Sequence, residues 1–243
     1  MNIESYKQQR ELFQKQMKQY RVQCTGCMQP DFGCYCAHIQ KFDPKIKFVV
    51  LIHPIEFKRR IATGRMSHQC LENSELIVGQ NYSANSKVNQ LLKDPRYQPM
   101  VLYPGAKSLN LTHASVEKKA LFFDSEKTPL VFVIDGTWAT ARRMMRHSEN
   151  INGLARFAFT PPGPSQFKVR KQPKAECYST IEAIHHCIEL LGAQVQFDFT
   201  GRPHDNLLAV FNKMVERQLI FIQEAFDNPK STSYRRVKHR IAG

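Results

Sequence analysis

The segment from Asp135 to Trp138 combines residue types that can do chemistry. A strongly apolar run at 130–134 leads directly into Asp135-Gly136-Thr137-Trp138, and Trp138 is the only tryptophan in the chain. A carboxylate at the end of a strand can act as a general base or can orient a ligand. An indole offers a flat face on which a nucleobase can stack, although a single tryptophan can also belong to the core. The segment is therefore a candidate catalytic turn.

A second candidate is a cluster of cysteines near the N-terminus. Four of the seven cysteines follow the spacing C-x2-C-x6-C-x-C, and they are Cys24, Cys27, Cys34 and Cys36. Two close pairs of thiolates joined by a turn can hold one structural Zn²⁺ tetrahedrally, with no position left open for water. Four reduced thiols without a metal, or an iron–sulfur cluster, remain alternatives. A thioredoxin-like redox site is disfavoured because no strand precedes the first pair. We expect Cys70, Cys177 and Cys187 to be ordinary buried thiols.

The charge of the chain predicts a polyanionic partner. Of its 243 residues, 35 are Lys or Arg and 21 are Asp or Glu, for a net charge of +14. Cations that neutralise phosphates release condensed counterions, which favours binding. We therefore favour nucleic acid as the partner over the alternative that the positive charge only keeps the protein in solution. No run approaches the roughly 18 apolar residues of a membrane span. The polar helical pattern at 3–22 does not resemble a signal peptide, so we expect a cytoplasmic protein.

Strands and helices are expected to alternate along the chain. Short apolar runs predict strands at 47–54, 75–80, 100–105, 130–136 and 155–160. Helical patterns lie at 3–22, 63–72, 86–93, 137–149, 179–192 and 203–226. Ser179 and Glu182 form the capping box that starts the fifth of these helices. Continuous apolar strands are typical of a parallel sheet covered on both faces, so the sequence predicts an α/β fold with a mostly parallel sheet.

Polar residues follow several of the predicted strands. Ligands of α/β sheets bind outside the carboxyl ends of the strands, so we expect these residues to converge on one site. They are His53, Glu56, Arg59, Arg60, Thr63, Gly64 and Arg65 after the first strand, Pro104 and Gly105 after the third, Asp135 to Trp138 after the fourth, and Arg170, Lys171, Pro173, Ser179 and Thr180 beyond the fifth. Any one of them could be structural, and His53 could simply satisfy a backbone group.

The order of these blocks resembles the DTW-domain family. The name-giving motif matches Asp135, Thr137 and Trp138. The cysteine cluster, HPIEFKRRIATGR at 53–65, Tyr103-Pro104 and RKQPKAECYSTIEAI at 170–184 also match. The resemblance covers about residues 24 to 190. We expect an N-terminal helix at 1–22, a zinc knuckle at 23–40, a catalytic domain at 41–230 and a basic tail at 231–243.

The resemblance implies a tRNA-uridine aminocarboxypropyltransferase. Such an enzyme moves the 3-amino-3-carboxypropyl group of S-adenosylmethionine to N3 of a uridine and releases methylthioadenosine. It also implies a SPOUT-like knotted domain, which nothing in composition or periodicity indicates. A SPOUT-type methyltransferase and a non-catalytic zinc-knuckle RNA-binding protein are the alternatives.

The resemblance and the residue chemistry together suggest roles for three groups of residues. Asp135, Thr137 and Trp138 would be catalytic. S-adenosylmethionine would be bound by Pro104, Gly105, Arg170, Lys171, Pro173, Ser179, Thr180 and Glu182. The tRNA would contact His53, Glu56, Arg59, Arg60, Arg65, Arg142, Arg143 and the tail.

Overall fold

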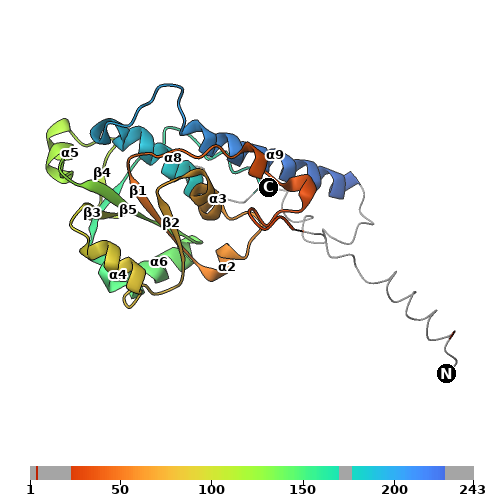
Figure 1. The fold of residues 1–243 in the computed structure, drawn as a ribbon, viewed down its shortest axis with the longest axis horizontal. Helices are drawn as coiled ribbons and strands as arrows, with labels where there is room; N and C mark the ends of the chain where they lie inside the picture. Colours follow the sequence, from red (N-terminus) through yellow and green to blue (C-terminus); the bar gives the residue numbers. More distant parts are fainter. Residues whose placement is uncertain (1–3, 5–22, 170–176, 228–243) are drawn as a thin grey trace.

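A parallel sheet forms the centre of the molecule (Figure 1). The computed structural model describes residues 4, 23–169 and 177–227. Within them, six strands form one sheet in the order β2-β1-β5-β3-β6-β4, and every neighbouring pair is parallel. The strands are β1 (Lys47–Ile52), β2 (Ser74–Val78), β3 (Tyr97–Leu102), β4 (Leu109–Asn110), β5 (Thr128–Asp135) and β6 (Ala155–Ala158). The predicted α/β fold with a mostly parallel sheet is confirmed.

The central strands β1 and β5 contain unbroken apolar runs, at 48–52 and 130–134, because both of their faces are covered. In β1, Phe48 and Val50 join the core on one side of the sheet, while Val49 and Leu51 join the core on the other. Strand β5 alternates in the same way, with Val131 in the first core and its chain neighbours Leu130 and Phe132 in the second. Successive side chains of a strand point to opposite faces, so a doubly covered strand reads as an unbroken apolar run.

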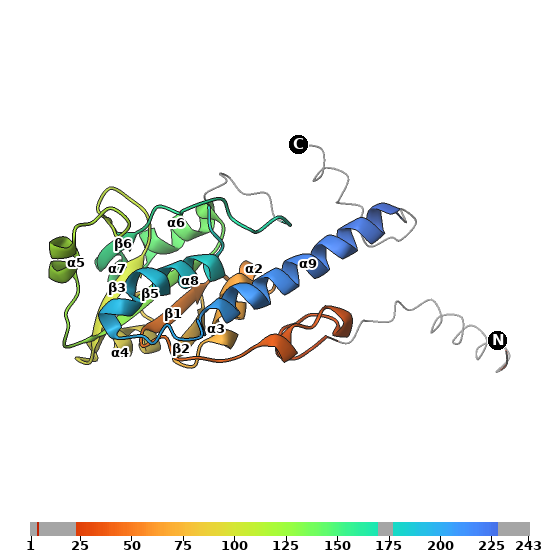
Figure 2. The same ribbon diagram turned by 90° about the horizontal axis from the view of Figure 1, so that it is seen from above.

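Helices cover the two faces in two groups (Figures 1 and 2). One face carries α3 (Thr63–Cys70), α8 (Thr180–Leu191) and α9 (Asp205–Asp227), which pack on one another. The other face carries α4 (Ser86–Lys93), α6 (Trp138–His147) and α7 (Glu149–Asn152). In Figure 2, α9 runs past the sheet toward the cysteine-rich segment, where the rings of Phe32 and Phe221 meet edge to face at 4.8 Å. No helix of the described ranges combines the length and apolarity of a membrane span.

Several elements differ from the sequence prediction. The helix expected at 137–149 is two helices, because Ser148 interrupts it between α6 and α7. The elements not predicted are the short α2 (Pro54–Phe57), the edge strand β4, α5 (Val116–Phe122) and three 3-10 turns, η1 (Asp31–Gly33), η2 (Cys36–His38) and η3 (Gly192–Val195). Helix α5 is only seven residues long and buries none of them fully, so its sequence is too short to show a clear helical periodicity. The predicted helix at 3–22, apart from Glu4, and the tail at 231–243 lie outside the described residues.

Candidate active site

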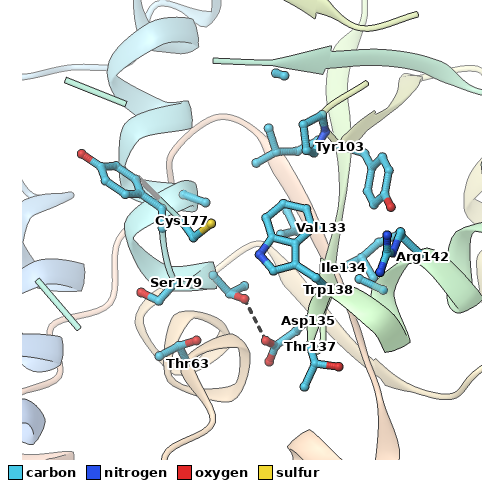
Figure 3. A pocket seen from close by; sticks show the side chains of 18 of the residues that line it. Thr63, Tyr103, Val133, Ile134, Asp135, Thr137, Trp138, Arg142, Cys177 and Ser179 are labelled. Carbon is cyan, nitrogen blue, oxygen red and sulfur yellow. Dashed lines mark hydrogen bonds between the residues drawn. The ribbon is translucent and has the colours of Figure 1, made fainter. Parts of the chain in front are cut away.

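A cavity of about 710 Å³ opens at the carboxyl ends of β3 and β5 (Figure 3). Its size falls within the range of roughly 300–1,000 Å³ that is usual for small-molecule sites. The cavity is lined by Thr63, Pro104, Asp135, Gly136, Thr137, Trp138, Ser179 and Thr180, which were predicted to converge, and by Arg142, which was predicted to contact tRNA. The structure therefore brings together side chains from three strand ends and from the start of α8, as expected for a parallel sheet.

Asp135 is buried at the floor of this region and its carboxylate is held on both sides. Only 6% of the residue is exposed. Its Oδ1 accepts a hydrogen bond of 2.8 Å from the hydroxyl of Thr180, and its Oδ2 accepts one of 3.1 Å from the backbone N–H of Gly64. Its own carbonyl accepts from the backbone N–H of His53 at 2.9 Å. The carboxylate is thus fixed by the first residues of α3 and α8.

The turn after Asp135 starts helix α6 and presents Trp138 to the cavity. Thr137 is the N-cap of this helix, and its hydroxyl accepts a 3.2 Å hydrogen bond from the N–H of Thr140. A Cβ on Gly136 would lie 2.6 Å from Oγ1 of Thr140, so only glycine fits beside the cap. Trp138 is 42% exposed, which is inconsistent with a core tryptophan. In Figure 3 its indole and the thiol of Cys177 point into the same cavity.

The start of α8 carries the predicted capping box. The carboxylate of Glu182 accepts hydrogen bonds from the N–H of Ser179 at 2.8 Å and from its hydroxyl at 2.6 Å. The same carboxylate accepts from the hydroxyl of Ser165 at 2.7 Å and from the N–H of Gln166 at 2.6 Å. Glu182 does not line the cavity. Instead it ties the loop at 165–166 to the helix and so places Phe167, which does line it.

The residues predicted to contact tRNA occupy very different positions. His53 is 6% exposed, and its Nδ1 accepts from the N–H of Ile55 at 3.2 Å as the N-cap of α2. Glu56 is 3% exposed and pairs with Arg59 at 3.0 Å. The side chains of His53 and Glu56 therefore stabilise the local structure around α2. The side chains of Arg59, Arg60, Arg142 and Arg143 are exposed.

Arg65 does not fit the prediction that it contacts tRNA. It is 5% exposed, and its guanidinium donates to four backbone carbonyls, those of Cys27, Phe57, Arg59 and Arg60. A guanidinium that is committed to buried carbonyls cannot reach a phosphate without breaking these bonds. Arg65 instead joins the cysteine-rich segment to the α2–α3 connection.

Several lining residues were not among the predicted site residues. Tyr103, Phe159 and Cys177 all line the cavity. The prediction that Cys177 is an ordinary buried thiol is wrong, since it is partly exposed there, whereas Cys70 and Cys187 are buried as expected. The position of Cys177, just before the capped helix that starts at the site, was the available signal. Of the residues predicted to bind S-adenosylmethionine, Gly105 does not line the cavity. Arg170, Lys171 and Pro173 lie outside the described residues.

The four clustered cysteines have the arrangement of a tetrahedral metal site. Their sulfurs lie within 4.8 Å of one another, with 3.6 Å between Cys24 and Cys36 and 3.6 Å between Cys27 and Cys34. Tetrahedral Zn–S bonds of about 2.3 Å place neighbouring sulfurs about 3.8 Å apart. Backbone N–H groups of Cys27 and Gly26 lower the pKa of Cys24 to about 6. Burial raises the pKa of Cys27 and of Cys36, so a nearby cation is needed to ionise these two thiols. The cluster fits a zinc knuckle.

Comparison with known proteins gives a family and several named relatives. The relatives are each called tRNA-uridine aminocarboxypropyltransferase 2. The protein from Drosophila melanogaster is 27% identical over 179 residues, which cover 70% of this chain and 67% of the fly protein. Those from Macaca fascicularis and Mus musculus are 23% and 24% identical over 176 residues, covering 70% of this chain and 57% of each relative. No solved structure matches. The family model of the DTW domain matches residues 21–219, and the chain therefore belongs to the DTW-domain family.

Proposed function

We propose that this chain transfers the 3-amino-3-carboxypropyl group of S-adenosylmethionine to N3 of a uridine in tRNA. Membership of the DTW family and the names of the relatives support the reaction class. The single observation that carries the proposal is the geometry of the DTW segment. It puts a buried, doubly held carboxylate, Asp135, next to an exposed indole, Trp138, in one cavity.

The reaction requires a deprotonated imide and an electrophilic carbon. The proton leaves N3 of the uracil, the N3 electron pair forms a bond to the γ-carbon of the methionine moiety, and the bond from that carbon to the sulfonium breaks. The electron pair of the broken bond returns to sulfur, so methylthioadenosine leaves as a neutral product. The positive sulfonium supplies the driving force, and the protein must orient the two reactants and accept or direct the N3 proton.

Asp135 is the residue suited to the proton. Its carboxylate is held by the hydroxyl of Thr180 and the N–H of Gly64 and belongs to the lining of the cavity, where it can meet the uracil N3–H. Because both bonds come from helix starts, the carboxylate cannot swing away from the reacting atoms. Asp135 either takes the proton as a base or holds the imide in line. Trp138 would stack the uracil, an interaction worth roughly 1–3 kcal/mol.

The polar end of S-adenosylmethionine needs donors and cations. The N–H of Ser179 is already bonded to Glu182, so the next amides of the twelve-residue helix α8, at Thr180 and Ile181, are the ones proposed to favour the carboxylate group of the methionine moiety. Arg170 and Lys171 are proposed to add positive charge, and Pro173, Glu182 and Gly105 to shape the surrounding loops. Apolar lining from Leu102, Val133, Phe159 and Phe167 is chemically suited to the adenine ring, with Pro104 at the rim.

Positive charge around the cavity is suited to tRNA. Arg142 lines the cavity and is exposed, and Arg143 lies beside it on α6. Arg59 and Arg60 are exposed after α2. We propose that these residues, with the tail at 231–243, contact phosphates of the tRNA. The proposed division of the chain is a helix at 1–22, a Zn²⁺ knuckle at 23–40, a catalytic domain at 41–230 and the tail. The SPOUT-like knot stays a prediction.

The decisive experiment identifies the product made from S-adenosylmethionine. The purified chain is incubated with S-adenosylmethionine and unmodified tRNA, and the small products are separated. The proposal expects methylthioadenosine and an equal amount of modified uridine. S-adenosylhomocysteine would indicate a methyltransferase, and the absence of both products would indicate an RNA-binding module.

A further inference from the structure

A second group of potential metal ligands lies between helices α8 and α9. It consists of His185, Glu189, His204 and Asp205, each of which offers one ligand atom, and these atoms lie within 4.8 Å of one another. None of the four lines the cavity described above. The DTW motif and the cysteine cluster do not include them. A proposal about this group therefore does not depend on the proposed reaction.

The helices bring these residues together through simple spacing. His185 and Glu189 are four residues apart on α8 and so lie on the same face, one turn apart. His204 and Asp205 are adjacent where α9 begins. Between the helices, Gly201 and Arg202 both adopt positive φ, 69° and 48°, and this left-handed turn folds Arg202 back onto the group.

The group has imidazoles at its base and carboxylates at its rim. His204 is 0% exposed and His185 is 9% exposed, while the side chains of Glu189 and Asp205 are 31% and 45% exposed. Nε2 of His204 lies 2.9 Å from Oε1 of Glu189 and 3.7 Å from Oδ1 of Asp205. Nε2 of His185 lies 2.8 Å from the same Oδ1. The four ligand atoms thus form a small, partly exposed polyhedron.

A positive charge already sits against this polyhedron. The guanidinium of Arg202 donates to Oδ2 of Asp205 at 2.7 Å, to Oδ1 of Asp205 at 3.0 Å and to Oε1 of Glu189. Half of the Arg202 side chain is exposed, so it can turn out into solvent without crossing the core. The two carboxylates are therefore assembled around a cation that is replaceable.

We propose that His185, Glu189, His204 and Asp205 form a second divalent transition-metal site, in which Arg202 is the competing cation. Two imidazoles and two carboxylates suit Zn²⁺ and similar ions, whereas Mg²⁺ and Ca²⁺ prefer oxygen ligands alone. Zn–N and Zn–O bonds of about 2.0–2.2 Å require ligand atoms about 3.4 Å apart in a tetrahedron. The separations of 2.8, 2.9 and 3.7 Å bracket that value. The ion would replace the shared imidazole protons and clip the end of α8 to the start of α9.

Cobalt spectroscopy separates this site from the cysteine knuckle. The full chain, stripped of metal, is titrated with Co²⁺. Cobalt in the knuckle gives intense thiolate-to-metal charge-transfer bands, whereas cobalt bound by imidazole and carboxylate gives only weak visible bands. We expect the chain to bind a second equivalent of Co²⁺. This second equivalent should increase the weak visible bands but leave the thiolate-to-metal charge-transfer bands unchanged. Elemental analysis with Zn²⁺ should likewise find two ions per chain.

Variants decide between a metal site and a purely structural network. His185→Gln should lose the second equivalent and keep the first, while the matched control His186→Gln, on the next residue of α8, should keep both. Arg202→Gln removes the competing charge, so it should bind the second ion about tenfold more tightly or better. Circular dichroism checks that each variant is folded. Binding of only the knuckle equivalent by wild-type protein and by Arg202→Gln would overturn the proposal.

Discussion

The hydroxyl of Thr180 and the carboxylate of Asp135 are 45 residues apart in the chain and 2.8 Å apart in the fold. The second oxygen of the same carboxylate accepts from the N–H of Gly64, which lies 71 residues away on the other side in sequence. One buried carboxylate therefore joins the starts of α3 and α8 to the end of β5. Because all three meet beside the cavity, a change in either donor should alter the position of Asp135.

Replacing Thr180 tests whether its hydroxyl positions Asp135. Thr180→Val keeps the shape of the side chain but removes the donor, so Oδ1 loses this bond. We expect turnover to fall by roughly 10²-fold, since displacements near 1 Å can have effects of that size, while tRNA binding is retained. Thr180→Ser keeps the hydroxyl and should retain most of the activity. Equal rates of methylthioadenosine formation by the two variants would show that the bond does not matter.

Replacing Gly64 tests how closely α3 approaches Asp135. A Cβ at this position would lie 2.4 Å from Oδ2 of Asp135 and 2.8 Å from Cγ1 of Val50. Glycine to alanine in a helix usually stabilises by up to about 1 kcal/mol, but overpacking here should destabilise by about 1–3 kcal/mol. The matched control is Gly153→Ala, whose Cβ would meet only the carbonyl of Glu149 at 3.7 Å. Urea unfolding measures both free energies, and a Gly64→Ala protein as stable as the control would contradict this packing.

The sheet could be predicted from sequence because its central strands are buried on both faces. Runs such as 48–52 and 130–134 are apolar without interruption, and the carboxyl ends of such strands are where a site is expected. That reasoning found Asp135 and Trp138. It could not find the bond from Gly64 to Asp135, because this contact depends on how α3 sits against β5.

The positive charge of a residue predicted its role less well than its position at the end of a strand did. Arg65 looked like a phosphate contact because its neighbours Arg59 and Arg60 are also basic. In the fold, four backbone carbonyls, including one from the cysteine-rich segment, gather around its guanidinium. Sequence does not show where carbonyls lack partners, so it cannot separate a buried arginine from an exposed one.

The cysteine knuckle should lose its metal when one ligand is removed. Cys34→Ser is expected to lower the zinc content by one ion per chain and to lower the stability of the fold at the same time, because binding of structural zinc is coupled to folding. Cys177→Ala is the matched control, since this thiol lies in the cavity and away from the knuckle. Elemental analysis is the measurement. Purified protein that contains neither zinc nor iron would rule out a metal-bound knuckle.

His68 should make the protein less stable in mild acid. Its Nδ1 lies 2.8 Å from the hydroxyl of Ser74, and burial lowers its pKa below the usual 6.5. Nearby Glu75 raises this pKa, and Lys41, Lys47 and Lys87 lower it further. The folded state therefore favours the neutral ring. Its stabilising effect is complete above the unfolded pKa and is lost as pH falls through the folded pKa.

His68→Asn isolates this contribution from that of the other histidines. Asparagine places a polar atom near Ser74 but does not titrate. Wild-type protein should lose more unfolding free energy than the variant between neutral and mildly acidic pH, as measured by urea unfolding. Parallel losses in the two proteins would mean that His68 is not the responsible group.

The role of Asp135 is tested most directly by the rate at which Asp135→Asn forms methylthioadenosine. An Asn can accept from the N–H of Gly64 with its oxygen and donate to the hydroxyl of Thr180 with its amide, so the fold and tRNA binding should survive. With saturating S-adenosylmethionine and tRNA, we expect the rate to fall by roughly 10²–10⁴-fold. Partial recovery at higher pH would identify Asp135 as the base, whereas weaker S-adenosylmethionine binding would identify it as a ligand-positioning group. A folded Asp135→Asn enzyme with a near-normal rate would contradict the assignment of this turn as the active site.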